Sequence, residues 1–382
     1  MVDGIMKELP EDLVIYVILM LPVKSLLRLK SSCITFCNII KSSTFINLHL
    51  NRTTNGKDEL ILFKRSFKQE EPNLHKNVLS FLLSEDTFNL KPISPDVEIP
   101  HLTNTNASVF HQLIGPCNGL IALTDSLTTI LFNPTTRIYR LIPPCPFGTP
   151  PGFRRSISGI GFGFDSIAND YKFVRISEVY KDPCEKDMKV EVFDMCTDTW
   201  RELHGQQLPM AFWTPCSEII YNCAFHWFAT ADDVVILCFD MCAEKFYNME
   251  TPGTCHWFDG KCYGLVILYK SLTLICYPDP MSTDPTEDLM DIWIMKEYGK
   301  KESWIKKCSI GPLPIESPLA VWKDDLLLFQ TKSGYLIAYD LNSDEVKEFN
   351  SHGFPTSLRV IVYKESLTPI PRNGDGTVVQ LF

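Results

Sequence analysis

The sequence lacks an apolar run long enough to cross a membrane as a helix. Its longest run, Leu13 to Leu21, holds nine residues, whereas a bilayer-spanning helix needs about 20. Acidic residues precede this run, where a secretory leader would carry basic ones. We therefore expect no membrane attachment and a reducing location, the cytoplasm or also the nucleus.

The sequence also lacks any pair of cysteines separated by two residues. Its 14 cysteines are scattered, and several, such as Cys223, lie in apolar runs where a free thiol packs as a small hydrophobic group. Cys33 and Cys37 are four residues apart, as are Cys238 and Cys242, but neither pair has the second matching pair that a zinc site requires. We expect no disulfide framework, no metal site and no cofactor.

Signatures of catalysis are missing as well. There is no phosphate-binding loop, no HExxH and no nucleophile elbow. The glycine-rich run at 159–163 lacks the spacing and the following helix of a dinucleotide site, so we expect strand and turn there. His226 lies inside an apolar strand and is expected to be a buried core histidine, and Cys117 and Cys145 have no evident histidine partner. We expect no catalytic residue, although a propeller enzyme with carboxylates or a metal at its axis stays a rival hypothesis.

Positive charge is scarce and unevenly placed. The 382 residues are 45% hydrophobic and 21% charged, as in ordinary globular proteins, and the net charge is −10. Residues 1–50 carry five basic and four acidic side chains, a net charge of +1, so residues 51–382 carry −11. The acidic body argues against nucleic-acid binding, which needs clustered Lys and Arg. It favours solubility in general and a basic partner in particular.

Helical signals are concentrated at the N-terminus, between Leu9 and Leu50. Pro10 suits the first helical position, and the acidic residues after it suit the positive end of the helix dipole. Pro22 should end this first helix. Ser25 can cap a second short helix, and a third carries Cys33 to Ile40 before two serines break it.

These three predicted helices cannot form a stable domain alone, because chains of about 40 residues usually need outside help. The first helix is apolar all round, which is typical of a helix that is buried on every side. Either the helices pack on the C-terminal domain as a cap, or they form a docking surface for a partner's helices. The residues alone leave both hypotheses open.

Beyond a polar stretch at 51–58, short β-rich runs separated by turn residues replace the helical pattern. A repeat is visible in which an apolar strand ends in an aromatic residue and Asp or Asn, followed by a short turn and a second strand. Its anchors are Asn133, Asp194, Asp240 and Asp340, which are 61, 46 and 100 residues apart. Because the last gap spans two units, the period is roughly 45–60 residues, which fits the blades of a β-propeller. Asx side chains at these places can accept hydrogen bonds from their own turns.

Five such units are recognisable, including a degenerate one at Ile292–Met295 and Ser303–Ile305. Residues 59–104 are expected to supply a sixth, and Val360 to Tyr363 to close the ring. Closure removes sheet edges that would otherwise aggregate. The fold expected is α+β overall: a short three-helix N-terminal unit and an all-β propeller of about six blades. The alternative is a β-sandwich or an open repeat.

The N-terminal stretch resembles an F-box, the motif that binds the Skp-type adaptor of cullin–RING ubiquitin ligases. Two Leu-Pro pairs bracket one helix and are followed by Ser-Leu-x-Arg. The matching positions are Leu9, Pro10, Leu13, Ile18, Leu21, Pro22, Ser25, Leu26, Arg28 and Ile40. Phe36, Ile34 and Met20 stand where the family often has Trp, Lys and Arg. The residues expected to bind the adaptor are Leu9, Pro10, Leu13, Ile18, Leu21, Pro22, Leu26, Leu29, Phe36 and Ile40.

The later chain resembles the F-box-associated, kelch-like domain of plant F-box proteins. The matching pieces are IGPCNGLIAL (114–123), LFNPTTRIYRLIPP (131–144) and GIGFGFDSIANDYKFVRI (159–176). Over nearly its whole length the chain is most similar to S-locus F-box proteins of self-incompatible plants. That resemblance implies a non-catalytic subunit of an SCF-type ubiquitin ligase that recognises S-ribonucleases in the pollen tube and directs their ubiquitination. Alternatives are a receptor for another target and a scaffold that acts outside degradation.

The expected domains are the F-box (1–50), a linker (51–58), the kelch-like propeller (59–370) and a C-terminal tail (371–382). A target-binding hypothesis rests on acidic side chains between prolines, because residues 271–295 contain no Lys or Arg. These are Asp279, Asp284, Glu287, Asp288 and Asp291. Such exposed acids mainly set association rate and partner choice, and a solvated loop is the alternative.

Overall fold

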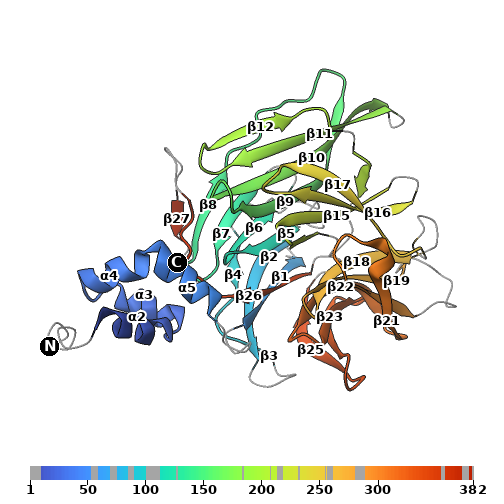
Figure 1. Ribbon diagram of the computed structural model, residues 1–382. Helices are drawn as coiled ribbons and strands as arrows, with labels where there is room; N and C mark the ends of the chain where they lie inside the picture. The colour runs from blue at the N-terminus through green and yellow to red at the C-terminus, as the bar shows by residue number, and fades with distance from the viewer. Residues whose placement is uncertain are drawn as a thin grey trace.

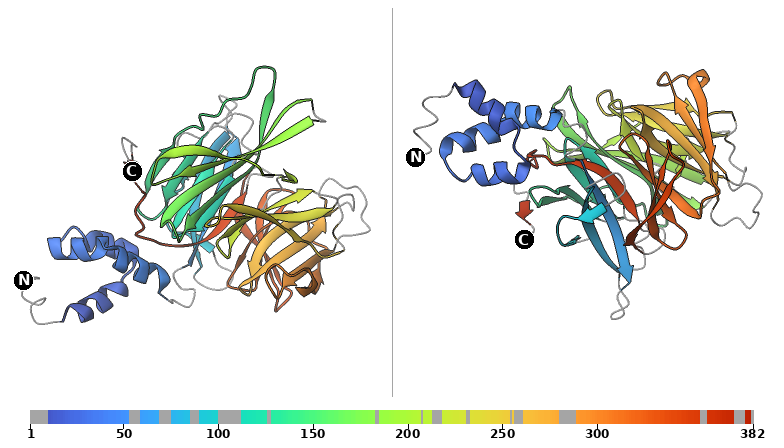
Figure 2. Two further views of the ribbon diagram at one scale, coloured as in Figure 1. Left: turned by 45° about the horizontal axis from the view of Figure 1, so that its top comes forward. Right: turned by 90° about the horizontal axis from the view of Figure 1, so that it is seen from below.

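The computed structural model describes residues 10–52, 59–68, 75–84, 90–99, 112–125, 128–182, 185–206, 208–212, 218–230, 233–253, 255, 261–279, 289–353, 358–371 and 378–380. Four helices form a small unit on one side of a ring of six β-sheets (Figures 1 and 2). In the described part of the chain, no helix is both long and apolar enough to cross a membrane.

The helical unit contains one more helix than the pattern predicts. Its members are α2 (Glu11–Leu19), α3 (Val23–Leu29), α4 (Ile34–Lys41) and α5 (Ser43–Asn51). Ser42 does end α4, but its hydroxyl then accepts a hydrogen bond from the Phe45 backbone N–H and so caps α5. The prediction that Ser25 caps the second helix is wrong. Pro22, whose φ is fixed near the helical value, holds that place, and Ser25 lies inside α3.

The ring consists of six separate antiparallel sheets, which confirms the propeller and excludes the sandwich. The first sheet contains β26 (Arg359–Lys364), β1 (Glu59–Lys68), β2 (His75–Ser84), β3 (Leu90–Pro92) and β4 (Val97–Glu98). The second contains β5 (Gln112–Cys117), β6 (Leu120–Thr124), β7 (Thr129–Asn133), β8 (Ile138–Ile142) and β27 (Val378–Gln380). The third contains β9 (Arg154–Asp165), β10 (Asp170–Asp182), β11 (Glu185–Asp194) and β12 (Thr199–Leu203).

The other three sheets follow the same order along the chain. The fourth contains β13 (Met210–Phe212), β14 (Ile219–Tyr221), β15 (Ala224–Thr230), β16 (Val234–Asp240) and β17 (Lys245–Glu250). The fifth contains β18 (Lys261–Leu268), β19 (Ser271–Pro278), β20 (Met290–Met295) and β21 (Trp304–Ile310), with the 3₁₀ turn η3 (Lys301–Ser303) before β21. The sixth contains β22 (Ile315–Trp322), β23 (Leu326–Thr331), β24 (Tyr335–Asp340) and β25 (Val346–His352).

The first sheet closes the ring with strands from both ends of the chain. β26 pairs with β1, and Ile61 lies opposite Val362 in the register. This confirms the predicted closing strand and the predicted sixth unit. Residues 378–380, in the stretch expected to be a tail, form β27 and extend the outer edge of the second sheet beside β8.

The repeat anchors lie at the turn between the third and fourth strands of their sheets. The side chains of Asn133, Asp240 and Asp340 accept hydrogen bonds from backbone N–H groups two and three residues later, as predicted. Asp194 differs. Its carboxylate accepts from the Arg201 guanidinium at 2.6 and 3.2 Å, and its turn is closed by backbone contacts instead.

The glycine-rich run at 159–163 lies wholly within β9, so the turn expected there is absent from these residues. A methyl group added at Gly161 would come within 2.9 Å of Phe225 and 3.0 Å of Trp227, on β15 of the next sheet. A methyl group added at Gly159 would likewise crowd Trp227, and one added at Gly163 would crowd Met241. Alternate residues of a strand share one face, so the three glycines let the neighbouring blade pack closely.

Candidate docking surfaces

Helix α2 carries apolar side chains on two faces, one buried and one exposed. Val14 and Ile18 are buried among the other helices. Leu13, Tyr16, Val17 and Met20, spaced by three and four residues, are 50–66% exposed. Residues at that spacing share one face of a helix. We call these four residues the α2 stripe.

The α2 stripe explains why the first helix is apolar all round. One face builds the helical core, and the opposite face presents side chains of a size that is normally buried. At the start of α4, Ile34 is also 74% exposed. Apolar surface gathered in this way is typical of a protein–protein interaction site.

The residues predicted to bind the adaptor fall into four groups. Ile18, Leu26, Phe36 and Ile40 are buried in the helical core, where they hold the helices together. Leu21 and Leu29 are half-buried, and Pro10, Leu13 and Pro22 are exposed. Leu9 lies outside the described residues.

The residues predicted from the sequence to bind the adaptor do not include Tyr16, Val17 or Met20, three of the four members of the α2 stripe. Their three- and four-residue spacing is present in the sequence, but so is that of the buried face. Because both faces are apolar, periodicity alone cannot distinguish the inner face from the outer one.

The predicted acidic surface is only partly described. Asp279 follows β19, while Asp284, Glu287 and Asp288 lie outside the described residues. Asp291 lies in β20, where its carboxylate accepts hydrogen bonds from Lys306 and Ser309, each at 2.8 Å. Partial burial acts to raise the pKa of Asp291, but the hydrogen bonds from Lys306 and Ser309 and the charges of Lys306 and Lys261 together lower it. The charge of Asp291 is therefore balanced by β21 rather than directed at a partner.

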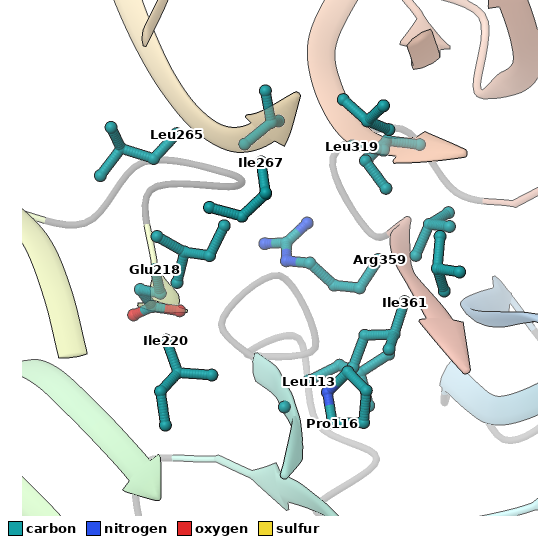
Figure 3. Close-up of a pocket in the computed structure, with 16 residues that line it drawn as sticks. Leu113, Pro116, Glu218, Ile220, Leu265, Ile267, Leu319, Arg359 and Ile361 are labelled. Carbon is teal, nitrogen blue, oxygen red and sulfur yellow. The ribbon is translucent and has the colours of Figure 1, made fainter. Parts of the chain in front are cut away.

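A cavity of about 260 Å³ occupies the middle of the ring. Its walls come mainly from β5, β14, β18, β22 and β26 and are largely aliphatic, and Arg359 and Glu218 extend toward it from different walls (Figure 3). Within the described residues, no three His, Cys, Asp or Glu side chains come close enough together to hold a metal ion.

His226, Cys117 and Cys145, the residues considered for catalysis, are buried or half-buried. His226 is fully buried, with its ring nitrogens 3.2 Å from the Ile219 carbonyl and 2.8 Å from the Tyr298 hydroxyl. Burial lowers the pKa of His226 to about 4, which confirms a core histidine that is neutral at physiological pH. Burial raises the pKa of the Cys117 thiol to about 12 and also raises that of Cys145, which disfavours the thiolate form that a cysteine-dependent ligase uses.

Comparisons with known proteins agree with this architecture. The model of the F-box associated beta propeller domain matches residues 78–370. The chain belongs to the F-box-associated β-propeller family. The F-box domain model matches residues 6–48, which include the α2 stripe. F-box domains bind Skp1-type adaptors in SCF complexes, and F-box proteins are generally the non-catalytic substrate-recognition subunits of those ligases.

Two relatives in Arabidopsis thaliana match over almost their full length. F-box protein CPR1 is 26% identical over 396 residues, covering 95% of this chain and 89% of the relative. A second F-box protein of that plant is 25% identical, covering 96% and 93%. Among solved structures, an oligogalacturonate lyase in complex with manganese is 9% identical with a TM-score of 0.40, covering 76% of this chain and 84% of the lyase.

Proposed function

We propose that this chain is the substrate-recognition subunit of an SCF-type ubiquitin ligase. Its helical unit docks a Skp-type adaptor, and through the adaptor the cullin and RING subunits. The observation that carries this proposal is the α2 stripe, an unpaired apolar face on the first helix of a matched F-box. A partner that supplies helices would cover it, as in other helix-in-groove contacts.

The propeller is proposed to hold the target. Residues 51–382 carry a net charge of −11, which would steer a basic protein toward the ring. Together with the resemblance to S-locus F-box proteins, this supports a basic S-ribonuclease as the target, bound in the cytoplasm of the pollen tube and ubiquitinated there. Catalysis by the complex is positional, because the receptor raises the effective concentration of target lysines near the charged conjugating enzyme.

Purified components test the proposal directly. The chain, bound to its adaptor, is assayed against a panel of S-ribonucleases and against a basic ribonuclease of similar charge from outside the S-locus. We expect some S-ribonucleases to bind and to be ubiquitinated in the reconstituted ligase, while the control ribonuclease does neither. Equal binding of the panel and the control would overturn the S-ribonuclease assignment. Binding without ubiquitination would support a scaffold instead.

A further inference from the structure

A residue from the far end of the chain completes the core of the helical unit. Leu367, in the segment that follows β26, is 9% exposed and belongs to the apolar cluster of the helices. The other buried members of that cluster all lie on α2 to α5. One side chain of the C-terminal segment thus packs inside the helical unit.

The residues on either side of Leu367 are fastened to the propeller. The side-chain amide of Asn133, which is fully buried, donates to the backbone carbonyls of Ser366 at 3.2 Å and Thr368 at 2.8 Å. The Ser366 N–H donates to the hydroxyl of Thr135, in the turn after β7, at 3.1 Å. Leu367 therefore projects from a segment that is held on both sides by the second sheet.

Arg52 forms a second connection between the two units. Its guanidinium donates to the carbonyls of Leu19 and Leu21, at 2.7 and 3.0 Å. Leu19 is the last residue of α2 and Leu21 lies two residues beyond it, at the end of the helix where carbonyls lack helical partners and a cation is favourable. The backbone carbonyl of Arg52 accepts a hydrogen bond from Lys364, the last residue of β26. Arg52 thus links the end of α2 to the strand that closes the propeller.

We infer that Arg52 and the 364–368 segment form a rigid joint, which fixes the orientation of the adaptor-binding helices relative to the propeller. The consequence of the joint for ubiquitination rests on the proposed function. If the adaptor and the target are held in one orientation, only a restricted set of lysines can reach the conjugating enzyme. Leu367 and Arg52 are then positioning residues, which contact neither the adaptor nor the target and act through geometry.

The joint is tested by measuring distances in the full chain bound to its adaptor. Spin-labelled non-natural amino acids replace Asn38 on α4 and Glu348 on β25, both exposed, and pulsed electron paramagnetic resonance gives the distance distribution. We expect one narrow peak for the wild type. Leu367→Ala and Arg52→Ala should each lose that peak and give a broad distribution, while Leu367→Met, which keeps an apolar side chain of similar volume, should retain it.

The control is Leu141→Ala, an exposed leucine on β8 whose side chain is not part of the joint, and it should leave the peak unchanged. The second measurement maps, by mass spectrometry, which lysines of the chain are ubiquitinated in the reconstituted ligase. The alanine variants should still fold and bind the adaptor, with Leu367→Ala melting earlier because it leaves a cavity in the helical core, and both should spread ubiquitin over more lysines. A broad distribution for the wild type, or an unchanged peak in both alanine variants, would overturn the joint. Failure of wild-type adaptor binding would overturn the proposed function instead, because the distances can still be measured in the free chain.

Discussion

The α2 stripe makes a quantitative prediction about adaptor binding. Val17 is 58% exposed and Met20 is 66% exposed. Complete burial of such a side chain is worth about 1.5–3 kcal/mol, so the part that a partner can still cover is worth about 1–2 kcal/mol per residue. The double substitution Val17→Ala with Met20→Ala should then weaken binding by about 2–4 kcal/mol, a rise in Kd of roughly 30- to 700-fold.

Titration calorimetry with the purified Skp-type adaptor measures this change. Because both side chains are exposed, thermal unfolding of the free chain should stay close to that of the wild type. Leu141→Ala, an exposed leucine of the propeller, is the matched control and should bind normally. A double variant that folds and still binds with wild-type Kd would refute the assignment of the α2 stripe.

The buried residue Ile18 provides the contrast. It is 4% exposed in the helical core, so Ile18→Asp would unfold the helices and abolish binding whichever face docks the adaptor. Ile18→Ala should lower the free energy of unfolding of the helical unit by about 2–5 kcal/mol. Loss of binding at position 18 therefore reports on folding, whereas loss at positions 17 and 20 reports on the interface.

Three further predictions concern the propeller. Lys172, in β10 of the third sheet, makes 2.6 Å ion pairs with Asp165 of the same sheet and with Glu244 of the fourth. Glu244 also pairs with Arg201, but Lys172→Met leaves the buried Asp165 carboxylate without a cation, so it should cost about 3–5 kcal/mol in urea unfolding. Unchanged stability would contradict a buried ion pair. Burial lowers the pKa of His226 to about 4, below its unfolded value of about 6.5. The unfolded chain therefore binds the proton first, and stability present above pH 6.5 should be lost as the pH falls toward 4. That part of the pH dependence should be missing in unfolding curves of His226→Gln, and an identical pH profile would count against it. Gly161→Ala should destabilise the propeller by about 1–3 kcal/mol, because the added methyl group meets Phe225 at 2.9 Å; an unchanged melting temperature would show that the blades can separate at little cost.

The sequence alone determined the architecture because the propeller is built from a local pattern. Strand, Asx residue, turn and strand recur within a dozen residues, so Asn133, Asp240 and Asp340 marked their blades without any knowledge of distant contacts. The closing strand was also predictable, since a ring needs a last strand and β26 has the composition of one. Of the described residues from which the adaptor motif was recognised, Ile18, Leu26 and Ile40 turn out to be core, whereas the others are half-buried or exposed.

Tertiary structure alone decided which residues face outward and what they meet. In α2, apolar residues on every side give no contrast from which the buried face could be read, and only packing against α3, α4 and α5 separates Ile18 from Val17. Leu367 enters the helical core from more than 300 residues away, a contact that no local periodicity encodes. For the same reason the sequence suggested that the charge of Asp291 could face a partner, whereas the structure shows Lys306 of β21 beside it. Local pattern specifies the elements, whereas the surfaces of this protein depend on contacts between residues that are distant in the sequence.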